Sequence, residues 1–327
     1  MATSNNKKQM NESPFLPLEV FFNILLCLPA EFLFNCGRYV CKAWAQIIRD
    51  PIFIKSHVLM SKSGLLIQGR LPQNFLFVEI KDDKLQERHL KHNFPGMLLS
   101  GCRGLLLFYL PDPCKSAFRV LNPITMQEEI LPFPFGTFRG DFRCYIVYIS
   151  QTEEYKVICL YSKARPLNWD VWTLGIDREW RSFFAPTYDS EDILSSVSVA
   201  EVVYVTVKPT NIIAINLVIE KFGFIELSRE ILTLPYLCVD VKNTLSFLVK
   251  QGANACICVL RDLEKQELVK VCEIKDTFRG MDVSSDRFAS IGWLENNWFY
   301  VFQRRLSGHL RNNRLEVYDQ NIGKARA

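Results

Sequence analysis

The sequence has little histidine, no long apolar run and no concentrated positive charge. Only four histidines occur in 327 residues, and His89 and His92 are the one close pair. No cysteine or carboxylate set completes a metal site around this pair, so we expect neither a metal nor another cofactor. The longest apolar stretch, 212–219, is broken by Asn216 and is much shorter than the roughly 18 residues that a membrane helix needs. We therefore expect no contact with a membrane.

The net charge of +4 is small and is spread along the chain, in isolated basic doublets such as Lys7-Lys8 and Arg304-Arg305. Nucleic-acid binders concentrate their basic residues on one face or in one run, so we expect no nucleic-acid partner. Residues 1–13 are polar and lack the apolar core of a signal peptide, and we expect them to be disordered. The 11 cysteines are odd in number and irregularly spaced, which is typical of reduced thiols in an intracellular core. These features predict a cytoplasmic or nuclear protein.

Catalytic patterns are also missing from the sequence. There is no Gly-x-Ser-x-Gly motif, and Gly101-x-x-Gly104 is too short for a nucleotide-binding loop. Cys256 and Cys258 would point to the same face of a strand, either as a thiol pair or as two small core residues. The adjacent carboxylates lie in polar, turn-like stretches, namely Asp82-Asp83, Glu128-Glu129, Glu153-Glu154 and Glu191-Asp192. We therefore expect a non-catalytic protein with no catalytic residues.

The hydrophobic pattern that is present changes its period once, near residue 60. Before this point the pattern predicts three short helices: one between Pro17 and Pro29, a second over residues 30–36 before Gly37, and a third ending before Pro51. Their apolar residues recur at helical spacing, namely Leu18, Phe21, Leu25 and Leu28 in the first helix and Val40, Trp44, Ile47 and Ile48 in the third. A module of about 40 residues is at the edge of independent stability. We expect a partner, or the rest of the chain, to complete it.

After residue 60 the pattern is strand-like almost to the end, and aromatic residues reach 13% of the chain. Fourteen candidate strands are too many for one ordinary sandwich, so a propeller-like array is favoured over a double sandwich. The predicted strands are 65–68, 74–80, 105–110, 118–121, 144–149, 155–161, 170–174, 202–207, 212–217, 245–249, 256–260, 268–272, 298–302 and 315–318. The fold class is therefore mainly β with a small N-terminal α module. We divide the chain into residues 1–13, 14–57, 58–320 and a tail, 321–327.

The N-terminal helices carry an ordered set of residues at nearly fixed spacing. In sequence order they are Leu16-Pro17, Ile24-Leu25, Leu28-Pro29, Leu33 and Val40-Cys41-Lys42-Ala43-Trp44. This set closely resembles the F-box, the docking module of ubiquitin-ligase adaptors. The alternative is a helical cap of a β domain that is similar to the F-box by chance.

The downstream chain is similar to the F-box-associated domain of plant F-box proteins. Its matching segments, in the order of the family, are Ser100–Leu106, Asn122–Thr125 with Ile130-Leu131-Pro132, Tyr155–Ile158, Asp170–Leu174 with Trp180-Arg181, and Leu315–Asp319. The likeness spans roughly residues 14–320. Two departures stand out: Gly37 looks like an inserted residue, and Val202–Tyr204 lacks the Gly-x-x-Tyr-Trp form of the family. An inserted residue inside a helix would rotate its face by about 100° and separate Leu33 from Trp44, whereas one in a linker would be harmless.

The resemblance implies a substrate-recognition adaptor of a Skp-cullin-F-box ubiquitin ligase. The helices would bind a Skp-type adaptor and, through it, a cullin scaffold, while the β domain would hold a protein substrate. The residues implied in adaptor binding are Leu16, Pro17, Ile24, Leu25, Leu28, Pro29, Leu33, Val40, Cys41, Lys42 and Trp44, some of them through the helical core. The aromatic loops 133–138 and 180–188 either contact the substrate or plug the β array. Two alternatives stay open: a stand-alone β-domain binding protein, lectin-like or protein-binding, and a propeller hydrolase or oxidase.

Overall fold

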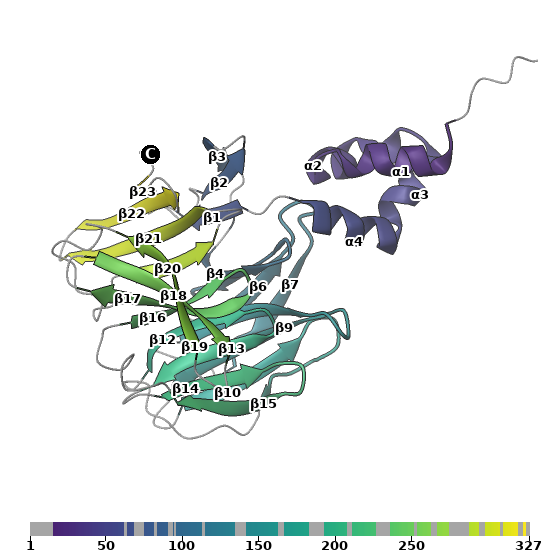
Figure 1. Cartoon of the computed structure of the whole chain (residues 1–327). Coiled ribbons are helices and arrows are strands. Elements are labelled where there is room, and N and C mark those ends of the chain that lie inside the picture. The colour runs from purple at the N-terminus through teal and green to yellow at the C-terminus, as the bar shows by residue number, and fades with distance from the viewer. Residues whose placement is uncertain are drawn as a thin grey trace, which may run out of the picture. The chain divides into compact units, whose positions relative to one another are not determined.

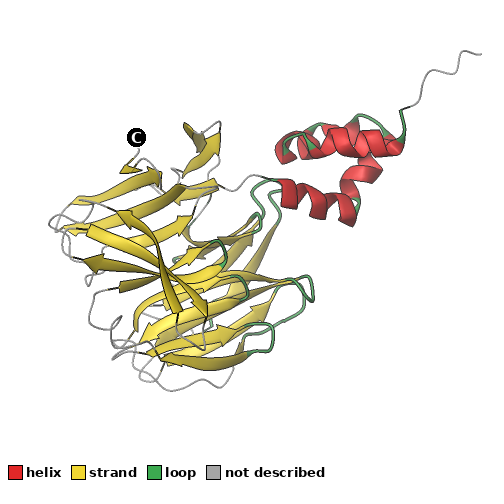
Figure 2. Ribbon diagram, viewed as in Figure 1, coloured by secondary structure: helices red, strands yellow, loops and turns green. Residues whose placement is uncertain are grey.

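The computed structural model divides the chain into two compact units, Met1–Ser61 and Lys62–Ala327, and each is described by itself (Figure 1). The described residues are 16–61, 64–68, 75–81, 84–90, 94, 96–112, 115–134, 142–162, 167–182, 193–207, 211–226, 236–251, 254–262, 267–274, 288–293, 298–307, 310–319 and 323–324. The first unit is helical and the second is built of strands, as the colours of Figure 2 show. The predicted change from helix to strand near residue 60 is confirmed.

The helical unit contains the three predicted helices and a fourth that was not predicted. Its elements are α1 (Leu18–Leu26), α2 (Ala30–Asn35), the 3₁₀ helix η1 (Gly37–Tyr39), α3 (Lys42–Arg49) and α4 (Pro51–Met60). Pro51 ends α3, as predicted, but it is also the first residue of α4, where a proline is tolerated. The Asp50 side chain accepts a hydrogen bond from the Ile52 amide at 2.7 Å and caps the new helix. Asp50-Pro51 therefore ends α3 and begins α4.

A small core holds these helices together. Leu25, Leu33 and Phe53 are its fully buried members, contributed by α1, α2 and α4. The rings of Phe22 and Phe53 pack edge to face, with their centroids 5.2 Å apart. His57 Nε2 lies 2.8 Å from the Leu28 carbonyl oxygen, which ties α4 to the segment between α1 and α2. Within the helical unit, α4 is thus an integral part.

The second unit contains five four-stranded antiparallel sheets, preceded in the chain by a three-stranded one. The three-stranded sheet is β1 (Gly64–Gln68), β2 (Phe75–Lys81) and β3 (Lys84–Leu90). The four-stranded sheets are β4–β7 (Met97–Cys102, Leu105–Leu110, Ala117–Leu121, Glu128–Pro132), β8–β11 (Phe142–Ile149, Glu154–Ser162, Leu167–Thr173, Arg181–Ser182), β12–β15 (Ile193–Val199, Val202–Val207, Asn211–Asn216, Lys221–Glu226), β16–β19 (Tyr236–Val241, Thr244–Gln251, Asn254–Asp262, Glu267–Ile274) and β20–β23 (Phe288–Trp293, Trp298–Ser307, Leu310–Asp319, Gly323–Lys324).

The sheets are arranged as the blades of a propeller. Within each four-stranded sheet the strands follow chain order, and the first strands of successive sheets are neighbours: β4 with β8, β8 with β12, β12 with β16, and β16 with β20. First strands that contact one another place the blades around a common axis. The propeller prediction is confirmed over the double sandwich, with five four-stranded blades.

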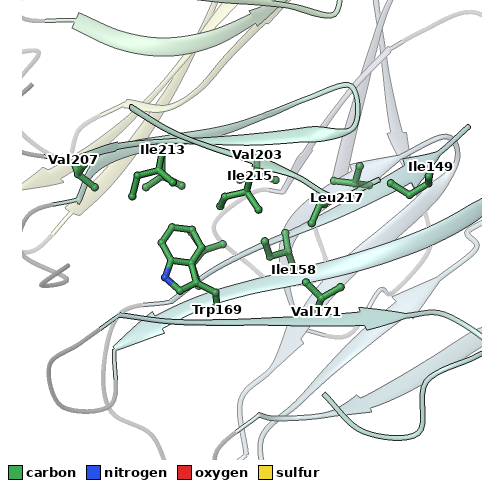
Figure 3. Packing of buried hydrophobic residues seen from close by; sticks show 12 residues of the cluster. Ile149, Ile158, Trp169, Val171, Val203, Val207, Ile213, Ile215 and Leu217 are labelled. Atoms are coloured by element: carbon green, nitrogen blue, oxygen red, sulfur yellow. The ribbon is translucent and has the colours of Figure 1, made fainter. Parts of the chain in front are cut away.

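Apolar side chains fill the space between neighbouring blades. Figure 3 shows the layer between the β8–β11 and β12–β15 blades, where the Trp169 ring faces the aliphatic side chains of the opposite sheet. Its buried members are Val147, Ile149, Ile158, Leu160, Trp169, Val171, Val203, Val205, Val207, Ile213, Ile215 and Leu217. Fully burying one such side chain is worth about 1.5–3 kcal/mol, so layers of this kind dominate the stability of the propeller.

Two further predictions concern metals and thiols. Among the described residues, no cluster of three or more His, Cys, Asp or Glu side chains could hold a metal ion; His89 lies on β3, and His92 is outside the described residues. Cys256 and Cys258 do share one face of β18, with their sulfurs 3.7 Å apart, and both belong to an apolar cluster. Over the same described residues, no helix has the length and apolar character that crossing a membrane requires.

Candidate functional site

The docking residues predicted from the sequence fall into two groups, and the first lies at the surface of the helical unit. Leu16 is 49% exposed, Ile24 43% and Val40 58%, which is unusual for large apolar side chains in a folded unit. The other exposed members of the predicted set are Pro17, Pro29, Cys41 and Lys42. These seven residues are available to a partner in the described structure.

The second group forms the interior. Leu25 and Leu33 are buried, and Leu28 and Trp44 are half-buried against the same core cluster. These four residues hold the helices in place and so can affect a partner chiefly by shaping the surface above them. Cys41 also has a local structural role, because its sulfur accepts a hydrogen bond from the Trp44 amide at 3.5 Å at the start of α3.

Gly37 does not disrupt the helices, although it looks like an insertion. It lies at the start of η1, outside both α2 and α3, and Leu33 and Trp44 still join one core. Gly37 is nevertheless buried, and a Cβ atom there would lie 3.2 Å from Ile48 Cδ1. Gly37 is therefore packed closely against Ile48 and does not lie in an exposed linker.

Further exposed apolar residues of the helical unit were not in the predicted set. The helical spacing of the first helix includes Leu18, which is 65% exposed at the start of α1. The others are Val20, Phe32, Tyr39, Ile52, Ile54, Val58, Leu59 and Met60, five of them on α4. A helix that is apolar around its whole circumference is typical of one covered on more than one side. This composition of residues 51–60 was the signal in the sequence that could have identified the α4 surface.

A cation lies beside the aromatic residues at the junction of α2 and η1. The Arg38 guanidinium carbon is 3.9 Å from the centroid of the Phe34 ring and 4.8 Å from that of Tyr39. Such contacts hold a guanidinium in place through its attraction to the ring faces. The Tyr39 ring, which is 70% exposed, therefore lies at the surface next to a positive charge.

In the propeller, two of the segments that resemble the family motifs carry side chains that bind the next blade. Lys156 of the Tyr-Lys-Val-Ile segment and Arg181 of the Trp-Arg pair both bind Glu220, in the turn between β14 and β15 of the next blade. The Arg181 nitrogens donate to the two carboxylate oxygens at 2.7 and 2.9 Å, and Lys156 Nζ donates to Glu220 at 2.7 Å and to the Leu217 carbonyl at 2.9 Å. Arg181, followed by Lys156, lowers the pKa of Glu220 to about 2.

The aromatic loops proposed for substrate contact are partly internal. Phe133 packs against the rings of Phe118 and Phe142, with centroids 5.1 and 5.6 Å away. Trp180 packs on Trp172, at 5.6 Å, and its Nε1 donates to the Pro132 carbonyl at 2.6 Å. These contacts favour the plug interpretation for the start of each loop, while residues 135–138 and 183–188 lie outside the described part of the chain.

Two other segments of the family type are tight turns. Arg103 and Gly104, both with positive φ (45° and 84°), connect β4 to β5, so Gly101-x-x-Gly104 is a hairpin and not a phosphate loop. The Asn122 side chain accepts hydrogen bonds from the Ile124 and Thr125 amides at 3.0 and 3.1 Å, which fixes the turn between β6 and β7. Val202–Tyr204, where the family form is absent, nevertheless lies in β13 of a complete blade.

Comparison with known proteins agrees with this architecture. Residues 65–292 match the family described as "F-box associated beta propeller domain", and residues 14–60 match the family described as "F-box-like". Two F-box/kelch-repeat proteins of Arabidopsis thaliana are each 26% identical to this chain, over 178 and 181 residues. The matched stretches cover 51% and 49% of this chain and 42% of each relative, so the chain spans less than half the length of the curated relatives that it matches.

A chain of a solved nidogen–laminin complex also aligns, with a TM-score of 0.46 and 9% identity over 81% of this chain and 92% of that one. The first family match alone covers more than half of the sequence. The chain therefore belongs to the plant F-box proteins that carry a C-terminal F-box associated beta propeller domain.

Proposed function

We propose that the chain is the substrate-recognition adaptor of a Skp-cullin-F-box ubiquitin ligase. The helical unit binds a Skp-type adaptor, which connects it to a cullin scaffold, and the propeller holds a target protein for ubiquitination. The chain itself performs no chemistry in this role. It accelerates the transfer by raising the effective concentration of the target beside the ubiquitin-conjugating machinery.

The distribution of exposed apolar side chains carries this proposal. Of the twenty large apolar side chains that are exposed in the part of the chain whose side-chain burial is described, which excludes β20–β23, twelve lie between Leu16 and Met60. The helical unit thus exposes many more large apolar side chains than the three that it buries in its core. Exposed apolar patches mark interaction sites. The exposed side chains project from helices, which supports recognition by helix packing into a partner groove.

The test compares adaptor binding by two variants of the full chain. Ile24→Asp with Val40→Asp places charges at two exposed apolar positions, and Gln46→Asp places a charge at an exposed polar position of α3 as the control. We expect the bound adaptor to bury both Ile24 and Val40, and losing these two contacts removes about 3 kcal/mol or more of binding free energy. Adaptor affinity should therefore fall at least tenfold in the double variant. The control should bind like the unmodified chain, and all three proteins should have the same helix content by circular dichroism.

Adaptor binding of unchanged affinity in the double variant would refute the docking surface. If the unmodified chain itself failed to bind at micromolar concentration, a stand-alone binding protein would replace the ligase adaptor as the better proposal. Affinity purification from cells with the intact and double-variant chains then separates the two halves of the function. Ligase subunits should be lost from the variant, and the target protein should be retained by both.

A further inference from the structure

Two cysteines of the β8–β11 blade lie directly opposite each other on neighbouring strands. Cys144 of β8 is the register partner of Cys159 of β9, and their sulfurs are 2.7 Å apart. Both side chains are buried in the layer between this blade and the β4–β7 blade, at 3% and 0% exposure. Nothing in the adaptor function uses this pair.

The backbone at this position suits a covalent link between the two strands. The Leu174 amide donates to the Tyr155 carbonyl at 2.9 Å, so Tyr155 directs its backbone groups toward β10 and away from β8. Alternation along β9 gives Cys159 the same direction, which makes Cys144–Cys159 a non-hydrogen-bonded pair. Such pairs hold their Cα atoms about 4.5 Å apart with the side chains close together, within the range that a disulfide spans.

We propose that Cys144 and Cys159 are a dithiol site that closes to a cross-strand disulfide when the chain meets an oxidising small-molecule disulfide. One protein thiolate attacks the small disulfide and releases one small thiolate, leaving a mixed disulfide. The second protein thiolate then displaces the other small thiolate. The two protein thiols lose two electrons and two protons, and the small disulfide is reduced to two thiols.

Burial controls when this exchange happens. Desolvation raises the pKa of the Cys144 thiol, and the neighbouring Cys159 raises it further. Because the thiolate is the attacking species, the folded blade reacts slowly, and the bond forms during folding or when β8 and β9 separate. The cytoplasmic or nuclear location predicted from the sequence would keep the pair as thiols until an oxidative challenge.

A second pair of close cysteines in the propeller, Cys256 and Cys258, shows whether proximity of two thiols is enough for a disulfide to form. Cys256 and Cys258 are two residues apart on one strand, with sulfurs 3.7 Å from each other. They are neighbours along β18 and do not face each other across strands, so they lack the backbone arrangement of the Cys144–Cys159 pair. A disulfide specific to the opposed pair is therefore distinguishable from general oxidation of close cysteines.

The experiment refolds the full chain in glutathione buffers that range from reducing to oxidising, followed by alkylation of free thiols and peptide mapping. We expect a linked peptide that joins Cys144 to Cys159 in the oxidising buffers, with Cys256 and Cys258 alkylated. Alkylation of both Cys144 and Cys159 in every buffer overturns the proposal. So does a disulfide that joins either of them to a different cysteine.

Thermal unfolding gives a second readout. The oxidised chain should melt several degrees above the reduced chain, because the link restricts the unfolded state. Cys144→Ser should abolish this redox-dependent shift, and Cys256→Ala should retain it. A shift that persists in Cys144→Ser contradicts the proposal; if that variant does not fold, the peptide map of the unmodified chain decides it alone.

Discussion

Glu220 offers a quantitative test of how neighbouring blades are held together. Its carboxylate accepts from both Lys156 and Arg181 of the preceding blade, and the Lys156 side chain is only 9% exposed. The pKa of Glu220 falls from 4.5 to about 2, and a tenfold change in acid dissociation is worth about 1.4 kcal/mol, so the ionised form gains about 3 kcal/mol in the folded state. The Arg181 side chain is 42% exposed, and solvent screens part of this gain. We expect Glu220→Gln to lower the free energy of unfolding at pH 7 by about 2 kcal/mol.

The effect has a defined dependence on pH. Glu220 titrates near 4.5 in the unfolded chain and near 2 in the folded chain. Its stabilising contribution is therefore complete above about pH 5.5 and is lost progressively as the pH falls to 2. The difference between the unmodified chain and Glu220→Gln should be largest at pH 7 and should shrink at pH 3.

Urea unfolding followed by tryptophan fluorescence measures this difference, since Trp169 and Trp172 lie in the blade that contains Lys156 and Arg181. Glu273→Gln is the matched control, because the Lys270–Glu273 pair has side chains 47% and 40% exposed. Its loss should be below about 0.5 kcal/mol. Equal losses in the two variants, or a difference that grows on acidification, would show that Glu220 does not stabilise the propeller in this way.

The helical unit permits three further predictions, each measured by thermal or urea unfolding. Leu25→Ala should cost about 2–5 kcal/mol because Leu25 is fully buried, whereas Ile24→Ala at the exposed neighbour should cost less than about 1 kcal/mol; similar losses would contradict the division into core and surface. Asp50→Ala should cost about 1 kcal/mol through loss of the α4 cap, and retention of full stability would show that the cap is dispensable. Gly37→Leu should cost about 1–3 kcal/mol because its side chain would collide with Ile48, and an unchanged midpoint would mean that the η1 turn relaxes freely.

The strands that the sequence revealed are those at the middle of each blade. All ten second and third strands of the four-stranded blades coincide with predicted segments, while four of the five first strands and four of the five fourth strands were missed. Middle strands such as β13 and β14 have neighbours on both sides and many buried residues, so they read as continuous apolar runs. First strands include polar segments such as Ile193–Val199 with three serines, and the fourth strand β7 carries two glutamates and a proline. An edge position requires neither a continuous apolar run nor a full set of backbone partners, and its signal is correspondingly weak.

The docking surface was predicted as a set of residues, but the sequence could not say which of them face outward. Ile24 and Leu25 are adjacent, equally apolar and both part of the same motif, yet one is 43% exposed and the other is fully buried. Their separation depends on how α1 rotates against α2 and α4, which is decided by packing with Leu33 and Phe53. A charge at Leu25 would therefore unfold the unit before it reported on any partner, which is why the docking test uses Ile24.

The family-like segments of the propeller also limit where the proposed target protein can bind. Lys156, Arg181 and Trp180 are engaged in contacts between or within blades, so these three motif side chains are not free to contact a target. A surface that discriminates among targets must use exposed residues outside those contacts. Ile176 and Ile219, each 60% exposed, are such residues, and they lie in the β10–β11 and β14–β15 turns that the Arg181–Glu220 ion pair brings together. The bridge between these blades therefore also fixes the spacing of two exposed apolar turns, which makes them the first positions to substitute once a target is known.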